Sequence, residues 1–234
     1  MKYENVSIWG VLPSETGPDE FGQLAETWAK LSASASDSYQ YEALRDGELV
    51  SGVADSTDEL AVAFTGAVSG SFETTEKKLQ FGPVPFSLNL YSGTESYPLA
   101  PCWEVAIDAN LFRTELGHTA ETISERVKAV VDLTASAHRA TGALYTYTQP
   151  TIDPYELSLH PDREQITENR LESIYWLTVF SPALLSPGER SSLHSYPNCD
   201  TRELTDGSMV VVCGGNPIEK SPRKLQEIES HVWS

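Results

Sequence analysis

The side chains that most often carry chemistry are scattered along this chain. Of its five histidines, only His194 lies close in sequence to other metal-ligand types, Cys199 and Asp200. A structural zinc site takes four ligands, and this segment supplies no fourth, so we expect no metal site here. His160 stands beside a proline in a polar segment, which favours a solvated turn over a catalytic role. The spacing identifies no catalytic residue and indicates no cofactor.

Two carboxylates share one face of a predicted strand. Glu104 and Asp108 alternate with apolar residues across residues 102–112, the pattern of a strand with one dry and one solvated face. At ~3.3 Å per residue they lie about 13 Å apart. That separation is too long for a two-carboxylate hydrolase centre made of these residues alone. We expect them to solvate the strand, and they are candidates for contact with a protein partner.

Two tyrosines form a second candidate contact surface. Tyr145 and Tyr147 share one face of a strand predicted at residues 144–148. Exposed tyrosines anchor protein interfaces because they bury a large area at low entropic cost. The alternative is that both rings pack in the core under the helices.

Common catalytic motifs are absent from the sequence. It contains no phosphate-binding or dinucleotide-binding glycine loop, serine-hydrolase elbow, zinc-protease motif or kinase signature. Residues 214–217, Gly-Gly-Asn-Pro, lack the helix start and basic residue of a phosphate loop, so a turn is the better interpretation. An enzyme would have to assemble its site from dispersed residues. The candidates are His138, His160, His194, Glu104 and Asp108.

The chain is strongly acidic. Its 234 residues include 34 Asp and Glu against 16 Lys and Arg, a formal net charge of −18, and the acids are dispersed rather than gathered in a tail. This composition resembles that of haloarchaeal proteins, whose acidic surfaces stay soluble in concentrated salt; the alternative is an ordinary acidic protein. The charge disfavours nucleic-acid binding, because no basic patch is present to neutralise phosphates. A protein partner would be expected to present a basic surface.

The sequence also constrains the environment. No run approaches 18 apolar residues, so no membrane span is expected, and the N-terminal segment does not resemble a signal peptide. We therefore expect a cytoplasmic protein. Cys102, Cys199 and Cys213 have no zinc or redox spacing and are expected to be buried thiols. Cys199 and Cys213 flank a predicted hairpin, which leaves a disulfide between them open.

Hydrophobic periodicity predicts the elements that position these residues. Strands are expected at residues 6–12, 39–44, 48–53, 83–90, 102–112, 144–148, 174–180 and 209–213. Helices are expected at residues 18–31, 119–141 and from 221 onward, while 55–68 fits either a helix or a strand. Residues 149–168 and the polar segment 186–200 are expected to be loops. Asp46-Gly47 is a strong hairpin signal between two of the strands.

Helices interspersed with antiparallel hairpins predict an α+β fold, with mostly antiparallel sheet layers and helices on one face. We expect a single domain over residues 1–234. A subdivision into 1–80 and 81–234, as two ferredoxin-like halves, is also compatible with the element order, although no internal repeat supports it. The apolar runs 174–180 and 209–213 are expected to be neighbouring strands at the centre of the sheet.

The segment around these two runs resembles part of a known family. A tryptophan-containing strand leads into a leucine-bearing turn, and a later apolar strand ends at a proline. The matching positions are Trp176, Pro182, Leu184, Leu185, Gly188, Leu204, Gly207 and Pro217. Residues 171–217, about a fifth of the chain, thereby resemble an uncharacterised immunity-protein-like family associated with polymorphic toxins. The resemblance implies a binding protein and transfers no catalytic residue.

Two hypotheses follow. In the first, the chain is a non-catalytic, immunity-like protein that binds a basic protein partner through its acidic surface. In the second, it is a small-molecule enzyme with a site assembled from the dispersed histidines and carboxylates. Convergence of two histidines beside a carboxylate in one pocket would distinguish the second from the first.

Overall fold

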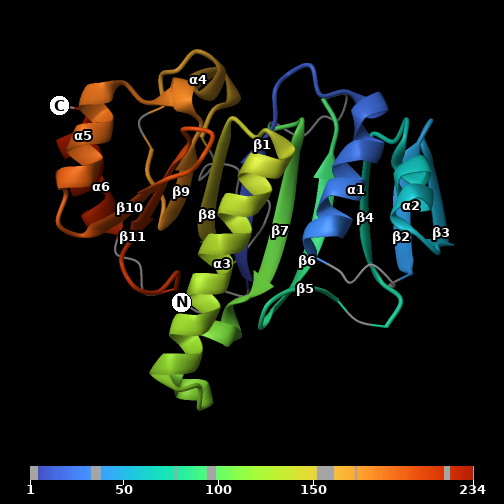
Figure 1. Cartoon of the computed structure of the whole chain (residues 1–234), viewed down its shortest axis with the longest axis horizontal. Helices are drawn as coiled ribbons and strands as arrows, with labels where there is room; N and C mark the ends of the chain where they lie inside the picture. The colour runs from blue at the N-terminus through green and yellow to red at the C-terminus, as the bar shows by residue number, and fades with distance from the viewer. Residues whose placement is uncertain are drawn as a thin grey trace.

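The computed structural model describes residues 5–32, 38–76, 78–93, 99–151, 161–171, 173–218 and 222–233, which form an α+β fold (Figure 1). The strands are β1 (Asn5–Val11), β2 (Tyr39–Arg45), β3 (Glu48–Ala54), β4 (Ser69–Thr74), β5 (Leu79–Phe81), β6 (Val84–Tyr91), β7 (Cys102–Asp108), β8 (Tyr145–Thr151), β9 (Leu177–Phe180), β10 (Cys199–Glu203) and β11 (Met209–Cys213). The helices are α1 (Phe21–Ser32), α2 (Thr57–Phe64), α3 (Ala120–Thr141), α4 (Arg163–Thr167), α5 (Pro187–Ser195) and α6 (Pro222–Val232). Short 3-10 turns are η1 (Pro18–Glu20), η2 (Ala109–Phe112), η3 (Thr114–Leu116) and η5 (Pro182–Leu184).

The described strands form one 11-stranded sheet. Its main order is β10-β11-β9-β8-β1-β7-β6-β4-β2-β3, and β5 pairs with β6 off this path. Every described pairing is antiparallel. The pairing of β4 with β6 joins the segments on either side of residue 80. No helix in the described part of the chain combines the length and apolar character needed to cross a bilayer.

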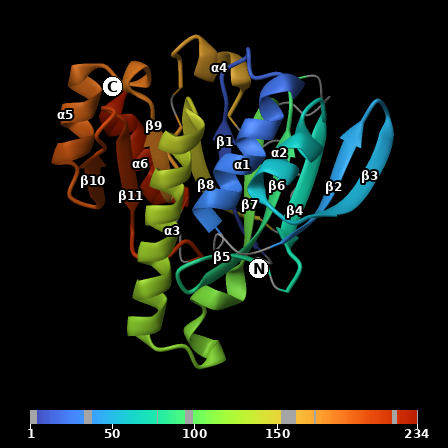
Figure 2. The same ribbon diagram turned by 45° about the vertical axis from the view of Figure 1, so that its right-hand side comes forward.

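Two apolar cores lie on opposite faces of this sheet. On β1, Val6 and Ile8 belong to the first core, whereas Trp9 and Val11 belong to the second, as the alternation of a strand requires. The first core contains residues of α1, α2 and α3, on the side we call the front face (Figures 1 and 2). The second contains residues of α4, α5 and α6, on the rear face. The expectation of helices on one face therefore holds only for α1–α3.

Local sequence explains the best-predicted elements. In α1, Phe21, Leu24 and Trp28 repeat at helical spacing and are all buried. In α3, Thr119 caps the N-terminus by accepting a hydrogen bond from the backbone N–H of Thr122. Gly142 ends that helix in the left-handed conformation. The helix expected at residues 119–141 is therefore confirmed.

The segment 55–68, compatible with either a helix or a strand, contains α2. Ser56 decides between them, because its side chain accepts a hydrogen bond from the backbone N–H of Glu59 and starts the helix. The β2–β3 hairpin is confirmed around Asp46 and Gly47, whose φ angles are 53° and 81°. Two left-handed residues define the two-residue turn that matches the natural twist of paired strands.

The expectation of a loop over residues 186–200 is wrong, because its first half forms α5. Pro187 occupies the first helical position, and Ser186 and Glu189 form a reciprocal capping box. The strand expected at residues 102–112 ends at Asp108, which caps η2. The loop expected at residues 149–168 is also partly wrong, because β8 extends to Thr151 and α4 follows. Residues 152–160 lie outside the described part of the chain.

The two apolar runs are neighbours, as expected, but not at the centre. β9 pairs with β11 in antiparallel register, with Val179 opposite Val210. These strands stand third and second from the β10 edge. Nearly all side chains of β9 and β11 are buried, because helices cover both faces of the sheet there. Val179 and Val210 pack in the front core, and Phe180 and Met209 pack in the rear core. The central strands are β8, β1, β7 and β6.

Candidate functional site

The rear face of β6, β4, β2 and β3 carries exposed polar side chains, in contrast to the covered rear face at the β8–β10 end. These four strands hold a groove of about 590 Å³. Its rear-facing lining is formed by Gln40, Glu42, Ser51, Val53, Ser71, Glu73, Ser87 and Asn89. We call this surface the open rear face. Among the described residues, the rear core contains no side chain from β2, β3 or β4.

Strand register aligns part of this surface into one row. Glu104 of β7 stands opposite Asn89 of β6, which stands opposite Ser71 of β4. Ser71 in turn faces Glu42 of β2, and Glu42 faces Ser51 of β3. Because directly opposed residues share a sheet face, a continuous polar row runs from the middle of the sheet to its outer edge.

The inner end of this row is a buried carboxylate. Glu104 is only 5% exposed, so the expectation that it lies on a solvated face is wrong. Ser7 donates a hydrogen bond to its Oε1 over 3.2 Å, and Asn89 donates one to its Oε2 over 3.1 Å. Burial raises the pKa of Glu104, and the two hydrogen bonds oppose that shift by favouring the charged form. A buried carboxylate thus lies beside the exposed groove.

The outer part of the open rear face is acidic with apolar spots. Glu42 and Glu73 are exposed, and the described residues that line the groove include no lysine or arginine. On β3, Leu49 is 65% exposed and Val53 is 60% exposed. The combination of exposed aliphatic side chains with carboxylates of one sign is typical of an interaction surface rather than of solvated structure alone.

The other predicted contact residues lie elsewhere. The structure places Tyr145 and Tyr147 in the rear core, where both are fully buried and their rings stack at 5.4 Å. The hydroxyl of Tyr145 donates to the carbonyl of Ser173 over 2.8 Å. This arrangement matches the alternative of core packing. Asp108 is exposed, and its side chain accepts a hydrogen bond from the backbone N–H of Asn110 at the start of η2.

The dispersed histidines do not converge with Glu104 in the described structure. His138 is buried in the helix–sheet contact on the front face, where its Nδ1 lies 2.9 Å from Oγ1 of Thr146. Glu104 projects from the rear face. His194 is exposed on α5, and His160 lies outside the described residues. The described residues contain no group of three or more His, Cys, Asp or Glu placed to hold a metal ion.

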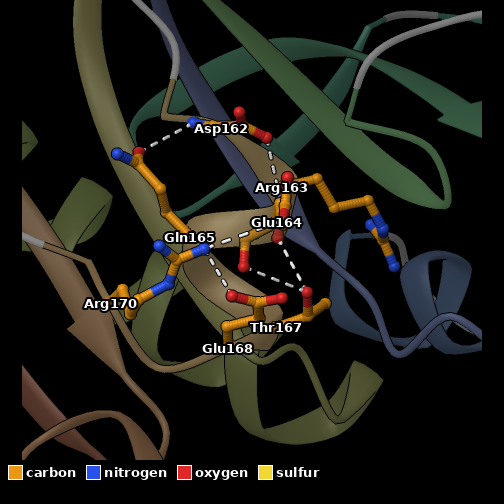
Figure 3. Close-up of polar contacts among 7 residues, drawn as sticks. All are labelled: Asp162, Arg163, Glu164, Gln165, Thr167, Glu168 and Arg170. Atoms are coloured by element: carbon orange, nitrogen blue, oxygen red, sulfur yellow. Dashed lines mark hydrogen bonds and ion pairs between the residues drawn. The ribbon is translucent and has the colours of Figure 1, made fainter.

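A second polar cluster surrounds α4 (Figure 3). Asp162 and Gln165 form a capping box, and Arg170 forms ion pairs with Glu164 and Glu168 on the exposed side. These ion pairs are solvated and contribute little to stability.

Arg163 points away from the cluster around α4 (Figure 3). Its guanidinium donates to the carbonyls of Leu12, Leu99 and Pro101 over 2.8–3.3 Å. These contacts tie α4 to the end of β1 and to the segment before β7. These backbone carbonyls and Oγ of Ser14 occupy its donors, which gives this residue a structural role.

Cys199 and Cys213 lie opposite each other on β10 and β11, which confirms that they are neighbours across a hairpin. Both are free thiols, as is the buried Cys102. The hydrogen bond between the side chains of Cys199 and Cys213 lowers the pKa of Cys199, while burial of the thiol opposes that shift.

Comparison with known proteins gives a likeness of fold only. No protein-family model matches the chain, and no curated protein matches it. Among solved structures, it is similar to a Pseudomonas aeruginosa T6SS protein, PA0821, with a TM-score of 0.51 and 12% sequence identity. The similarity covers 98% of this chain and 73% of that chain.

The sequence contained a weak signal for the open rear face. Ser87 and Asn89 alternate with buried apolar residues in β6, and Gln40 and Glu42 alternate with tyrosines in β2. Such alternation gives each strand a polar face. This alternation does not predict which strands are neighbours. β4 lies between β6 and β2 in the sheet, and this order depends on pairing between residues far apart in the sequence.

Proposed function

We propose that this chain is a non-catalytic protein-binding protein that captures a partner with a basic surface on its open rear face. The observation that carries the proposal is the uncovered acidic groove on β6, β4, β2 and β3. A face with this composition supports capture of a protein better than catalysis, because the lining that the structure describes for its groove holds carboxylates and hydroxyls but no histidine or cysteine. An immunity-like role, in which the partner is a toxin, is the specific form of this proposal.

Electrostatics supports a basic partner. The chain carries a net charge of −18, and Glu42 and Glu73 add a local negative potential at the groove. Complementary potentials accelerate association and disfavour wrong partners. Exposed Leu49 and Val53 supply apolar area that charge alone would not. The association rate should therefore fall as the salt concentration rises.

One likeness supports the immunity-like form, and a second fits a protein-binding role more generally. Residues 171–217 resemble an immunity-protein-like family through Trp176, Gly188 and Pro217 among other positions. The fold is similar to that of a protein named as a T6SS protein. The sequence resemblance bears on ancestry and the structural likeness bears on the fold, whereas the composition of the open rear face bears on what is bound.

Site-specific photo-crosslinking in the native host tests the proposal. A photoreactive residue at Ser87, which is exposed on the open rear face, should capture one basic protein. The same residue at Ser124, exposed on α3, should not capture it. The double charge reversal Glu42→Lys and Glu73→Lys should abolish capture at Ser87.

The matched control reverses two exposed carboxylates on α3, Glu121→Lys and Glu125→Lys, which changes the net charge equally. This control should retain capture at Ser87. Equal loss in both double variants would show that only the net charge matters. Capture at Ser124 but not at Ser87 would contradict the proposed face.

A further inference from the structure

The two outer edges of the sheet differ in their protection. β10 forms one edge; it is five residues long, carries exposed Asp200, Arg202 and Glu203, and lies against α5. β3 forms the other edge and pairs with β2 along all seven residues, from Glu48 to Ala54, without a bulge. It contains neither lysine nor proline. Natural proteins usually protect edge strands with charges, prolines, bulges or covering elements. On β3 the charge is Glu48 at its start, and α2, which follows β3 in the chain, contacts both β2 and β3.

Hairpin geometry identifies the unpaired backbone groups of β3. In a two-residue hairpin, the residues that flank the turn, here Arg45 and Glu48, exchange hydrogen bonds, and alternate residues point outward. On β2, the carbonyl of Leu44 accepts a hydrogen bond from the backbone N–H of Val68 and thus points away from β3, which agrees with this alternation. The backbone groups of Leu49, Ser51 and Val53 therefore face away from the sheet.

The same three residues place their side chains on the open rear face. Leu49 and Val53 are exposed there, with Ser51 between them at the end of the polar row. The carboxylate of Glu42 lies one strand inward, and that of Glu73 lies two strands inward. Backbone pairing groups, apolar contacts and negative charge thus occur together along one edge.

The front side of β3 is supported without covering the edge. Gly52 has no side chain, and the ring of Tyr41 fills its place, since a Cβ at position 52 would stand 2.7 Å from the tyrosine hydroxyl. A cross-strand aromatic over an edge glycine stabilises the strand and holds its register. β3 pairs with β2 without interruption and presents its outer backbone groups along one edge.

We propose that β3 is the docking edge for an extended, basic segment of the partner, which adds to the sheet as an antiparallel or parallel strand. This inference rests on the proposed function and specifies its binding mode. A strand added at about 4.8 Å from β3 would lie about 10 Å from β2. Alternate lysine or arginine side chains could lay their aliphatic stems over Leu49 and Val53 and extend their charges toward Glu42. The intervening apolar side chains would lie on the front side beside Val50, which is 44% exposed.

Charge favours this occupant over a second copy of the chain. Two copies joined edge to edge would each bring a net charge of −18, with Glu48 and Asp46 at the end of each hairpin. That repulsion opposes a dimer at moderate salt, where the Debye length is about 8 Å. A basic segment replaces this repulsion with attraction.

The test uses the full chain and a defined probe, an acetylated, fluorescent eight-residue peptide of alternating lysine and valine. Its control is the same peptide with N-methylated amides at alternate positions, which keeps the charge but removes the hydrogen bonds on one edge. A second N-methylated control covers the other set of positions. We expect the plain peptide to bind at 0.15 M salt, and at least one N-methylated peptide to bind at least tenfold more weakly.

A backbone variant gives the matching result on the protein side. Ser51→Pro removes an outward N–H without breaking the β2–β3 ladder, since proline is tolerated at edge positions whose N–H faces solvent. We expect Ser51→Pro to weaken binding at least tenfold, and by much more than Ser51→Ala, which keeps the backbone N–H. Circular dichroism and thermal melting verify that both variants are folded. If Ser51→Pro does not fold, the peptide comparison decides alone.

The outcomes separate this inference from the proposed function. The plain and the N-methylated peptides could bind equally, with the double variant Glu42→Gln and Glu73→Gln weakening the binding of each. In that case the open rear face captures basic chains by charge, and strand addition is refuted. If no peptide binds, strand addition is also refuted, while the crosslinking experiment still tests the proposed function. A stable dimer that disappears in Ser51→Pro would assign the edge to a second copy and overturn the inference.

Discussion

Asn89 donates a hydrogen bond from Nδ2 to Oε2 of Glu104 over 3.1 Å. This contact connects the exposed groove on β6, β4, β2 and β3 with a carboxylate buried at the middle of the sheet. Ser7, 97 residues away in sequence, donates the second hydrogen bond to the same carboxylate. The polar row on the open rear face is therefore fixed by long-range pairing of β1, β7 and β6.

Glu104→Gln should change how stability depends on pH. Burial raises the pKa of Glu104 in the folded state above its unfolded value of about 4.3. The stability that protonated Glu104 contributes is fully present below that unfolded value and is lost as pH rises through the folded pKa. The variant should therefore gain stability relative to the native chain as the pH rises from the unfolded pKa through the raised folded pKa.

Denaturant unfolding at several pH values measures this difference. Glu42→Gln, which removes an exposed carboxylate from the same face, is the control and should show a much smaller trend. A stability difference between Glu104→Gln and the native chain that stays constant across the range would contradict the buried-carboxylate interpretation.

His138 should produce the opposite pH dependence. Burial lowers its pKa from 6.5 to about 4, and the smaller attraction of Asp206 opposes that shift. The stability associated with neutral His138 is present above the unfolded pKa, about 6.5, and is lost as pH falls through the folded value. A shift of this size corresponds to about 3 kcal/mol. His138→Gln should remove this loss between pH 6.5 and pH 4, whereas His194→Gln, at an exposed site, should retain it.

Salt should stabilise the fold. The net charge of −18 produces self-repulsion at low ionic strength, and molar KCl reduces the Debye length to about 3 Å. The melting temperature should therefore rise with KCl concentration, and more steeply than in a variant with several exposed glutamates replaced by glutamine. An unchanged melting temperature between low and molar salt would rule out the haloarchaeal type of surface.

Gly10→Ala should severely destabilise the chain. Gly10 lies in β1 under the ring of Trp103, and an added Cβ would stand 2.0 Å from its Cε2. The ring is fully buried, so a shift would disturb the front core. We expect a loss of at least about 3 kcal/mol in the free energy of unfolding. Gly215→Ala, where an added Cβ meets nothing within 4 Å, should change the stability by less than about 0.5 kcal/mol.

Local patterns in the sequence predicted the elements that depend on local physics. The spacing of Phe21, Leu24 and Trp28 identified α1, and Asp46-Gly47 identified the β2–β3 turn. The missed helix α5 had a local signal as well, because Ser186 and Glu189 form a capping box and Pro187 occupies the first helical position. Its polar composition favoured a loop, although a short surface helix needs only one buried residue, here Leu193.

The candidate site depends on strand order, which local patterns do not determine. Alternation in residues 102–112 correctly gave Glu104 and the apolar residues opposite faces of the strand. It did not indicate that Ser7 and Asn89 would enclose the carboxylate. Likewise, Tyr145 and Tyr147 share a face, as predicted, but α4 and α6 contribute to the core that covers that face. Which polar faces stay open follows only from the whole sheet.

Amide hydrogen exchange of β3 in the presence of the alternating lysine–valine peptide tests the central claim most directly. The N–H groups of Leu49, Ser51 and Val53 should exchange rapidly in the free chain and slow at least tenfold on binding. The N–H groups of Val50 and Gly52, which already pair with β2, should change much less. Protection confined to α3 or to the β10 edge, or no added protection on β3 when the peptide is bound, would contradict the account.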